Sequence, residues 1–145
     1  MSVPSLVRVF VDALWTPVLV ALALTVLIAL VDTGVAVGER VWGLAALRKR
    51  GDAARAEALA RARIGRADVL ARVGPMLGLM GTLIPLGPGL AALGNGNVAV
   101  LAQAVTVAFD TTVMGLLVGV LAFIVSRLRR RWYDAVLDDL EDADA

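Results

Sequence analysis

The chain has 145 residues, of which 59% are hydrophobic, and a mean hydropathy of +0.82. Soluble domains contain about 45–50% apolar residues, so this composition indicates a membrane protein. The formal net charge is +1, and the chain has neither cysteine nor histidine. These absences exclude disulfides, thiolate chemistry, Cys–His or Ser–His catalysis and the commonest ligand of zinc. We therefore expect no enzyme activity, no cofactor and no metal site.

The first apolar run covers residues 15–38, which is long enough to span a bilayer because a helix needs about 20 apolar residues to do so. Residues 1–14 precede this span and form either a short interfacial helix or the beginning of the span itself. Asp32 lies near the end of the span. We expect it to stay hydrated there, as an interfacial carboxylate would.

Residues 39–73 predict a helical hairpin, because alanine and arginine dominate and both favour helices. Gly51 is expected to end the first helix, and Asp52 to cap the second. The arginines of this segment could bind nucleic acid or anionic lipid. A role in membrane topology, together with a solvated helical face, is the simpler interpretation, and we expect no nucleic-acid partner.

Residues 74–94 form the second predicted span and residues 98–126 the third, with a turn at Gly94-Asn95-Gly96-Asn97. In the second span, small or helix-kinking residues share one helical face, which favours close helix packing in membranes. This small-residue stripe consists of Pro75, Gly78, Thr82, Pro85, Gly89 and Ala92. Pro85 cannot donate to the carbonyl of Gly81, so a bend is expected there.

The third span has a small-residue stripe and a polar stripe on different faces. The small stripe consists of Ala108, Thr112, Gly115, Gly119, Ala122 and Ser126, and the polar stripe of Gln103, Thr106 and Asp110. An ionised carboxylate at this depth costs several kcal/mol, so Asp110 is a candidate functional residue. The alternative is a protonated or hydrogen-bonded acid that locks adjacent helices, and the sequence leaves both open.

Residues 127–145 predict a helix with an acidic tail. Only Arg8 of the 14 basic residues precedes the first span; the others lie between the first two spans or after the third. The positive-inside rule therefore places the N-terminus outside and the C-terminus in the cytoplasm. The expected fold is an all-α, multi-pass protein of the cytoplasmic (inner) membrane, with three transmembrane helices and helical cytoplasmic extensions.

Two motifs carry a resemblance to a known family. They are Gly74-Pro75-Met76-Leu77-Gly78-Leu79-Met80-Gly81-Thr82 in the second span and Phe109-Asp110-Thr111-Thr112-Val113-Met114-Gly115-Leu116 in the third. With the basic helical exit that follows, they resemble the MotA/TolQ/ExbB proton-channel family. The resemblance implies a ring of subunits, pentameric in better-known members. In that ring, the second and third spans of each subunit would surround a single-span partner dimer of the ExbD/TolR/MotB kind.

The same resemblance implies that Thr82 and Thr112 are the pore threonines. A glutamate of the ExbB and TolQ branches would fall at Val107 and is absent, and we infer that Asp110, one turn further along, replaces it. A threonine hydroxyl has no accessible pKa, so it can only orient water or relay hydrogen bonds. The short cytoplasmic segment marks a minimal member, for which flagellar rotor binding is not expected.

The sequence thus predicts the pore-forming subunit of a membrane complex driven by the proton or sodium motive force. The candidate ion-pathway residues are Asp110, Thr112, Thr82 and Thr111. The residues expected to line the pore or pack the helices are Gly78, Pro85, Gly89, Ala108, Gly115 and Gly119. The expected partners are further copies of the chain, the single-span dimer and lipid. Two alternatives stay open: a non-conducting homo-oligomeric scaffold and an autonomous ion channel without a partner.

Overall fold

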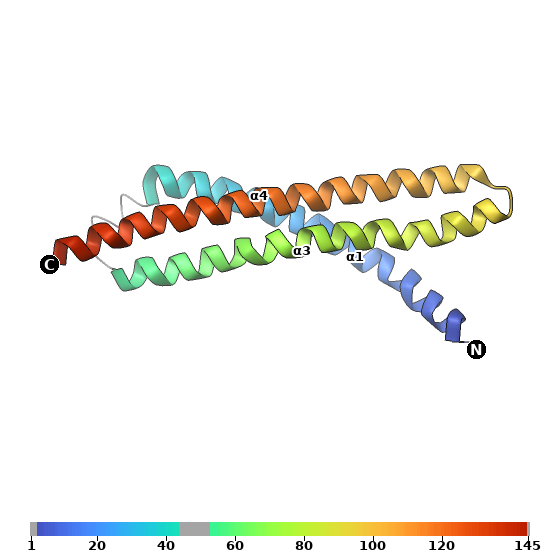
Figure 1. The fold of residues 1–145 in the computed structure, drawn as a ribbon, viewed down its shortest axis with the longest axis horizontal. Coiled ribbons are helices and arrows are strands. Elements are labelled where there is room, and N and C mark those ends of the chain that lie inside the picture. Colours follow the sequence, from blue (N-terminus) through green and yellow to red (C-terminus); the bar gives the residue numbers. More distant parts are fainter. Residues whose placement is uncertain (1–2, 44–52, 145) are drawn as a thin grey trace. The chain divides into compact units, whose positions relative to one another are not determined.

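The computed structural model describes residues 3–43 and 53–144, and all of these are helical except Asn95, Gly96 and Asn97. The elements are α1 (Val3–Gly38), a π-helical segment η1 (Glu39–Gly43), α3 (Ala53–Gly94) and α4 (Val98–Asp144) (Figure 1). Residues 3–14 and 15–38 belong to one continuous helix, α1. The helix break expected at Gly51 and Asp52 lies outside the described residues.

Among the described residues, three helices are long and apolar enough to cross a membrane, and they cover Ser5–Gly43, Ala54–Gly94 and Val98–Asp139. The prediction of an all-helical fold with three such helices is therefore confirmed for residues 3–43 and 53–144.

A short turn connects α3 to α4. The backbone N–H groups of Asn95 and Asn97 both donate to the carbonyl of Ala92, at 3.1 and 2.9 Å. Gly96 has a φ of +78°, which glycine adopts without the steric cost that a side chain would add. The Asn97 side-chain oxygen accepts the N–H of Val100 at 3.3 Å, so Asn97 caps the start of α4.

The chain divides into two compact units, of which the first consists of Met1–Val26 and Val73–Val118 and the second of Leu27–Arg72 and Gly119–Ala145. In the first unit, the last part of α3 and the first part of α4 lie side by side and antiparallel (Figure 1). In the second unit, the end of α1, the beginning of α3 and the end of α4 enclose small apolar clusters.

Glycines bring α3 and α4 together in the first unit. A Cβ atom on Gly115 would lie 2.7 Å from both the carbonyl oxygen of Gly74 and the Cα of Gly78. Such distances leave no room for a methyl group, so the backbones touch here, as small residues allow in membrane helices. We call this contact the glycine seam; it consists of Gly74, Gly78, Gly81 and Gly89 of α3 with Gly115 of α4.

The glycine seam shares Gly78 and Gly89 with the predicted stripe of α3, but at two other places the glycine one residue earlier takes part in the contact. Gly74 and Gly81 are buried in it, whereas Pro75 and Thr82 are only half-buried at its margin. The seam glycines of α3 are four, three and eight residues apart, and the residues of the predicted stripe are three and four apart. Both sets follow the helical period, so periodicity alone does not choose between them. The closer backbone approach at glycine decides the contact.

Two small apolar clusters lie among the described residues of the second unit. Ala60 of α3 packs with Tyr133 and Val136 of α4. Ala36 of α1, Ala67 of α3 and Val125 of α4 form the other cluster, against which Trp132 packs. These alanines let three helices approach one another closely, which brings the charged side chains between them within bonding distance.

Candidate ion-pathway residues and a buried charge cluster

Thr111 is turned into the contact between α3 and α4. Thr111 is only 5% exposed, and a Cβ atom added to Gly81 would lie 2.7 Å from the Cβ of Thr111. Its hydroxyl donates within α4, with the carbonyls of Val107 and Ala108 at 3.1 and 3.0 Å. Of the four candidate pathway residues, Thr111 is therefore the one buried inside a single subunit.

Thr82 and Thr112 are both half-buried at the margin of the glycine seam. Their hydroxyls donate to backbone carbonyls of their own helices, Thr82 to Leu79 at 2.6 Å and Thr112 to Ala108 at 3.0 Å. A hydroxyl has one donor and two acceptor lone pairs, so each oxygen can still accept a hydrogen bond. With about 100° per residue, helix geometry places both threonines on the same edge of the antiparallel pair, which we call the hydroxyl edge.

Asp110 is exposed on the single subunit and lies away from the hydroxyl edge. It is two residues from Thr112, which corresponds to about 200° around α4. Its polar-stripe neighbour Gln103 lines a pocket with residues of α1. The structure thus brings Thr82 and Thr112 to one edge of the hairpin and places Asp110 on the other.

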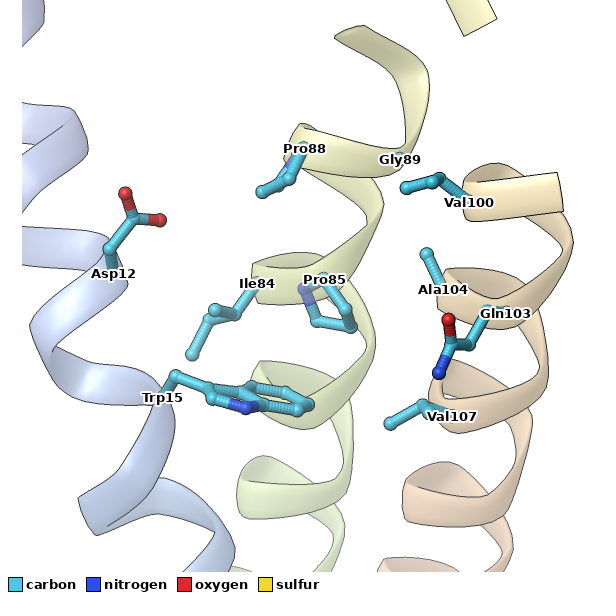
Figure 2. A pocket seen from close by; sticks show the side chains of 10 residues that line it. All are labelled: Asp12, Trp15, Ile84, Pro85, Pro88, Gly89, Val100, Gln103, Ala104 and Val107. Carbon is cyan, nitrogen blue, oxygen red and sulfur yellow. The ribbon is translucent and has the colours of Figure 1, made fainter. Parts of the chain in front are cut away.

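The residues predicted to line the pore or to pack are mostly buried inside the subunit. Gly78, Gly89 and Gly115 belong to the glycine seam, and Ala108 and Gly119 are also buried. Pro85 is half-buried and lines the pocket shown in Figure 2. Gly78, Gly89 and Gly115 therefore make contacts between α3 and α4 within one hairpin.

The pocket in Figure 2 has a volume of about 360 Å³ and lies in the first unit near the α3–α4 turn. The Trp15 indole of α1 extends beneath Ile84 and Pro85 of α3, and Asp12 stands one turn above it (Figure 2). On α4, Gln103 supplies a polar group. The pocket is mainly apolar, with two polar side chains at its rim. Sequence reasoning missed it because it depends on how α1 meets the hairpin.

A buried charge cluster occupies the second unit. The guanidinium of Arg129 is completely buried and donates to both carboxylate oxygens of Asp32, at 2.7 and 3.1 Å. It also donates to both oxygens of Glu39 at 3.2 Å. Arg63 approaches Glu39 at 2.7 Å and donates to the Tyr133 hydroxyl at 3.1 Å. Two acids and two arginines from η1 and three helices thus neutralise one another.

The electrostatics of Arg129 follow from this geometry. Burial alone would lower the pKa of Arg129, because it penalises the charged form. The hydrogen bonds and charges of Asp32 and Glu39 outweigh burial, so the pKa of Arg129 is raised above its ordinary value. The arginine therefore stays charged. Every buried side-chain nitrogen and oxygen among the described residues has a hydrogen-bond partner.

The expectation that Asp32 is hydrated was wrong. It is 9% exposed and paired with Arg129, 97 residues further along the chain. Its spacing to Glu39 gave a signal, because residues seven apart share a helical face. Ala29 and Ala36 share that face and are buried, so both acids had to face a neighbouring helix. Which basic residue would meet them depended on the helix register.

A second polar cluster joins α3 to α4. Asp68 accepts the hydroxyl of Ser126 at 2.5 Å and a guanidinium N–H of Arg130 at 2.6 Å. The Ser126 hydrogen bond is the main reason why the pKa of Asp68 is lowered; burial acts in the opposite direction, and Arg130 adds to the lowering. Within the described part of the chain, no three acidic groups gather as a metal ion would require.

Comparison with known proteins agrees with the sequence motifs. A family model described as the MotA/TolQ/ExbB proton channel family matches residues 45–142, more than half of the chain. The matched region contains both motifs and the basic helical exit. No curated protein and no solved structure matches the chain significantly.

Proposed function

Because the chain belongs to the MotA/TolQ/ExbB proton channel family, we propose that it is the pore-forming subunit of a complex that uses the proton or sodium motive force. The chain is a multi-pass membrane protein, and its family consists of membrane proton channels rather than enzymes. In the proposed orientation the N-terminus is outside the cytoplasmic membrane and the C-terminus inside. Further copies of the chain form a ring, with five subunits as in better-known relatives, around a single-span partner dimer.

The exposure of Asp110 carries this proposal. The carboxylate lies near the middle of the third apolar run and is exposed on the single subunit. Contact with lipid would cost several kcal/mol, so such side chains face protein or water within a membrane. Within the described part of the chain, Asp110 remains exposed. Another copy, a partner helix or a hydrated pore must cover it.

In a ring, the hydroxyl edge of one hairpin can face the edge of the next hairpin that carries Asp110. Head-to-tail contacts in a closed ring bring one face of each subunit against a different face of the next. We place the hydroxyl edge, with Thr82 and Thr112, toward the pore and toward the neighbouring copy that presents Asp110. The carboxylate takes part in the ion pathway, and the two hydroxyls orient water beside it. Thr111 supports this edge from inside the glycine seam.

The ring is testable by cross-linking, because the chain has no natural cysteine. In the proposed arrangement, Asp110→Cys combined with Thr112→Cys gives disulfide-linked ladders in oxidised membranes, since the two positions meet across copies. The matched control combines Asp110→Cys with Ala23→Cys, an exposed α1 position, and gives no ladder. Ladders of equal intensity in both would refute the arrangement.

Ion coupling is testable by flux in proteoliposomes, with and without a single-span partner that carries a membrane aspartate. We expect flux only with the partner, and its loss on Asp110→Asn or Thr112→Val with the oligomer intact. The control is Thr25→Val, because Thr25 also donates only to its own helix, with Leu22 at 2.8 Å. Flux from the pure chain would identify an autonomous channel. Absence of flux in every preparation would identify a non-conducting scaffold.

A further inference from the structure

A basic pocket of about 470 Å³ lies in the second unit, between α3 and α4. Three arginines line it, Arg72 from α3 and Arg127 and Arg130 from α4, and Asp68 is the one carboxylate among its lining residues. We propose that this arginine pocket binds the phosphate headgroup of an anionic phospholipid. The proposal goes beyond ion conduction, and only the leaflet concerned rests on the orientation proposed above.

The charges in the arginine pocket are not balanced. Asp68 is occupied by Arg130 at 2.6 Å and by the Ser126 hydroxyl at 2.5 Å. Arg72 and Arg127 are exposed, and no carboxylate among the described residues forms an ion pair with either. Two positive charges therefore remain at the pocket. Guanidinium groups bind phosphate oxygens through paired N–H donors, so phosphate is the ligand chemistry that complements them.

The position of the pocket favours a phosphate that is attached to a lipid. Arg72 comes two residues before the predicted second span, and Arg127 comes immediately after the third. Phe123 forms part of the wall, and the Arg127 guanidinium lies 5.2 Å from the centre of its ring. The wall thus changes from apolar to basic where acyl chain gives way to headgroup. Basic pockets between membrane helices at this level bind anionic headgroups.

The acidic tail of a neighbouring copy is the competing occupant, and helix geometry disfavours it. Asp138 lies 12 residues beyond Ser126 on the continuous helix α4. At about 1.5 Å per residue, this separation is about 18 Å along the helix axis. Copies with the same membrane orientation keep their acidic ends at the same level. The tail of a neighbour is therefore about as far from the arginine pocket as the subunit's own.

Lipid titration of the detergent-solubilised full chain, followed by native mass spectrometry, tests the proposal. We expect phosphatidylglycerol to bind at least tenfold more tightly than phosphatidylcholine of the same chain length. Each of Arg72→Gln and Arg127→Gln should weaken phosphatidylglycerol binding about fivefold, and the double variant about 25-fold. Arg72→Lys with Arg127→Lys keeps both charges and should stay within threefold of the wild type.

Arg131→Gln is the matched control, because Arg131 is an exposed arginine of the same helix outside the pocket. A loss in this control equal to that of Arg127→Gln would overturn the proposal, as would equal binding of the two lipids. Full displacement of the lipid by millimolar inorganic phosphate would overturn the assignment to a phospholipid. A fivefold gain in lipid affinity when Glu141, Asp142 and Asp144 are all changed to amides would identify the acidic tail as the occupant.

Discussion

Replacing Arg129 with glutamine tests whether the buried charge cluster stabilises the fold. The substitution removes the only side chain that forms an ion pair with Asp32 among the described residues, whereas Glu39 keeps Arg63 at 2.7 Å. One carboxylate is thus left buried without its counter-ion. Breaking a buried ion pair in this way costs about 3–5 kcal/mol. Domains are stable by only about 5–15 kcal/mol, so we expect a large loss of stability.

Unfolding by sodium dodecyl sulfate in mixed micelles measures this loss, with tryptophan fluorescence as the signal. Trp132, one of the three tryptophans, reports on the region because it packs beside the cluster of Ala36, Ala67 and Val125. Arg131→Gln is the control, since an exposed substitution changes stability by about 0.5 kcal/mol or less. Arg129→Lys should fall between the two, because lysine keeps the charge and loses the planar fork that reaches Asp32 and Glu39 together.

A double-mutant cycle separates charge pairing from simple loss of packing. Asp32→Asn removes the carboxylate that Arg129→Gln leaves unpaired. The two changes together should therefore destabilise less than the sum of the single changes, by about 1–3 kcal/mol. Additive effects, or equal stability of Arg129→Gln and Arg131→Gln, would show that the buried pairing does not stabilise the protein.

Three further predictions concern the glycines and Asp68. Gly115→Ala should destabilise by about 1–3 kcal/mol in the same unfolding assay, because its Cβ meets backbone atoms at 2.7 Å; Gly87→Ala, with nothing within 4 Å, should not. Gly96→Ala should cost about 1 kcal/mol because φ is +78°, and equal stability of this variant and the wild type would contradict the turn geometry. The pKa of Asp68 is lower in the folded state than in the unfolded chain, where it is near 3.9. This difference stabilises the fold at pH values above the unfolded pKa, and the contribution disappears as the pH falls through the folded pKa. Ser126→Ala removes the largest cause, so the difference in unfolding midpoint between this variant and the wild type should shrink between pH 7 and pH 3.

The sequence by itself determined the class of the molecule. Long apolar runs predict three spanning helices because a helix satisfies its own backbone groups wherever water is absent. Glycine and asparagine at residues 94–97 placed the turn, since glycine alone adopts a positive φ without strain. The motifs around Thr82 and Asp110 identified the family. Each of these signals is local, so no neighbouring helix was needed to read it.

Only the tertiary structure decided which faces meet. Periodicity fixes the angle of a residue around its helix and says nothing about the helix that lies opposite. Gly74 rather than Pro75, and Thr111 rather than Thr112, therefore entered the α3–α4 contact only once the two helices were packed. The pairing of Asp32 with Arg129 across 97 residues depends in the same way on the register between helices. A shift of one turn would move the two groups about 5.4 Å apart.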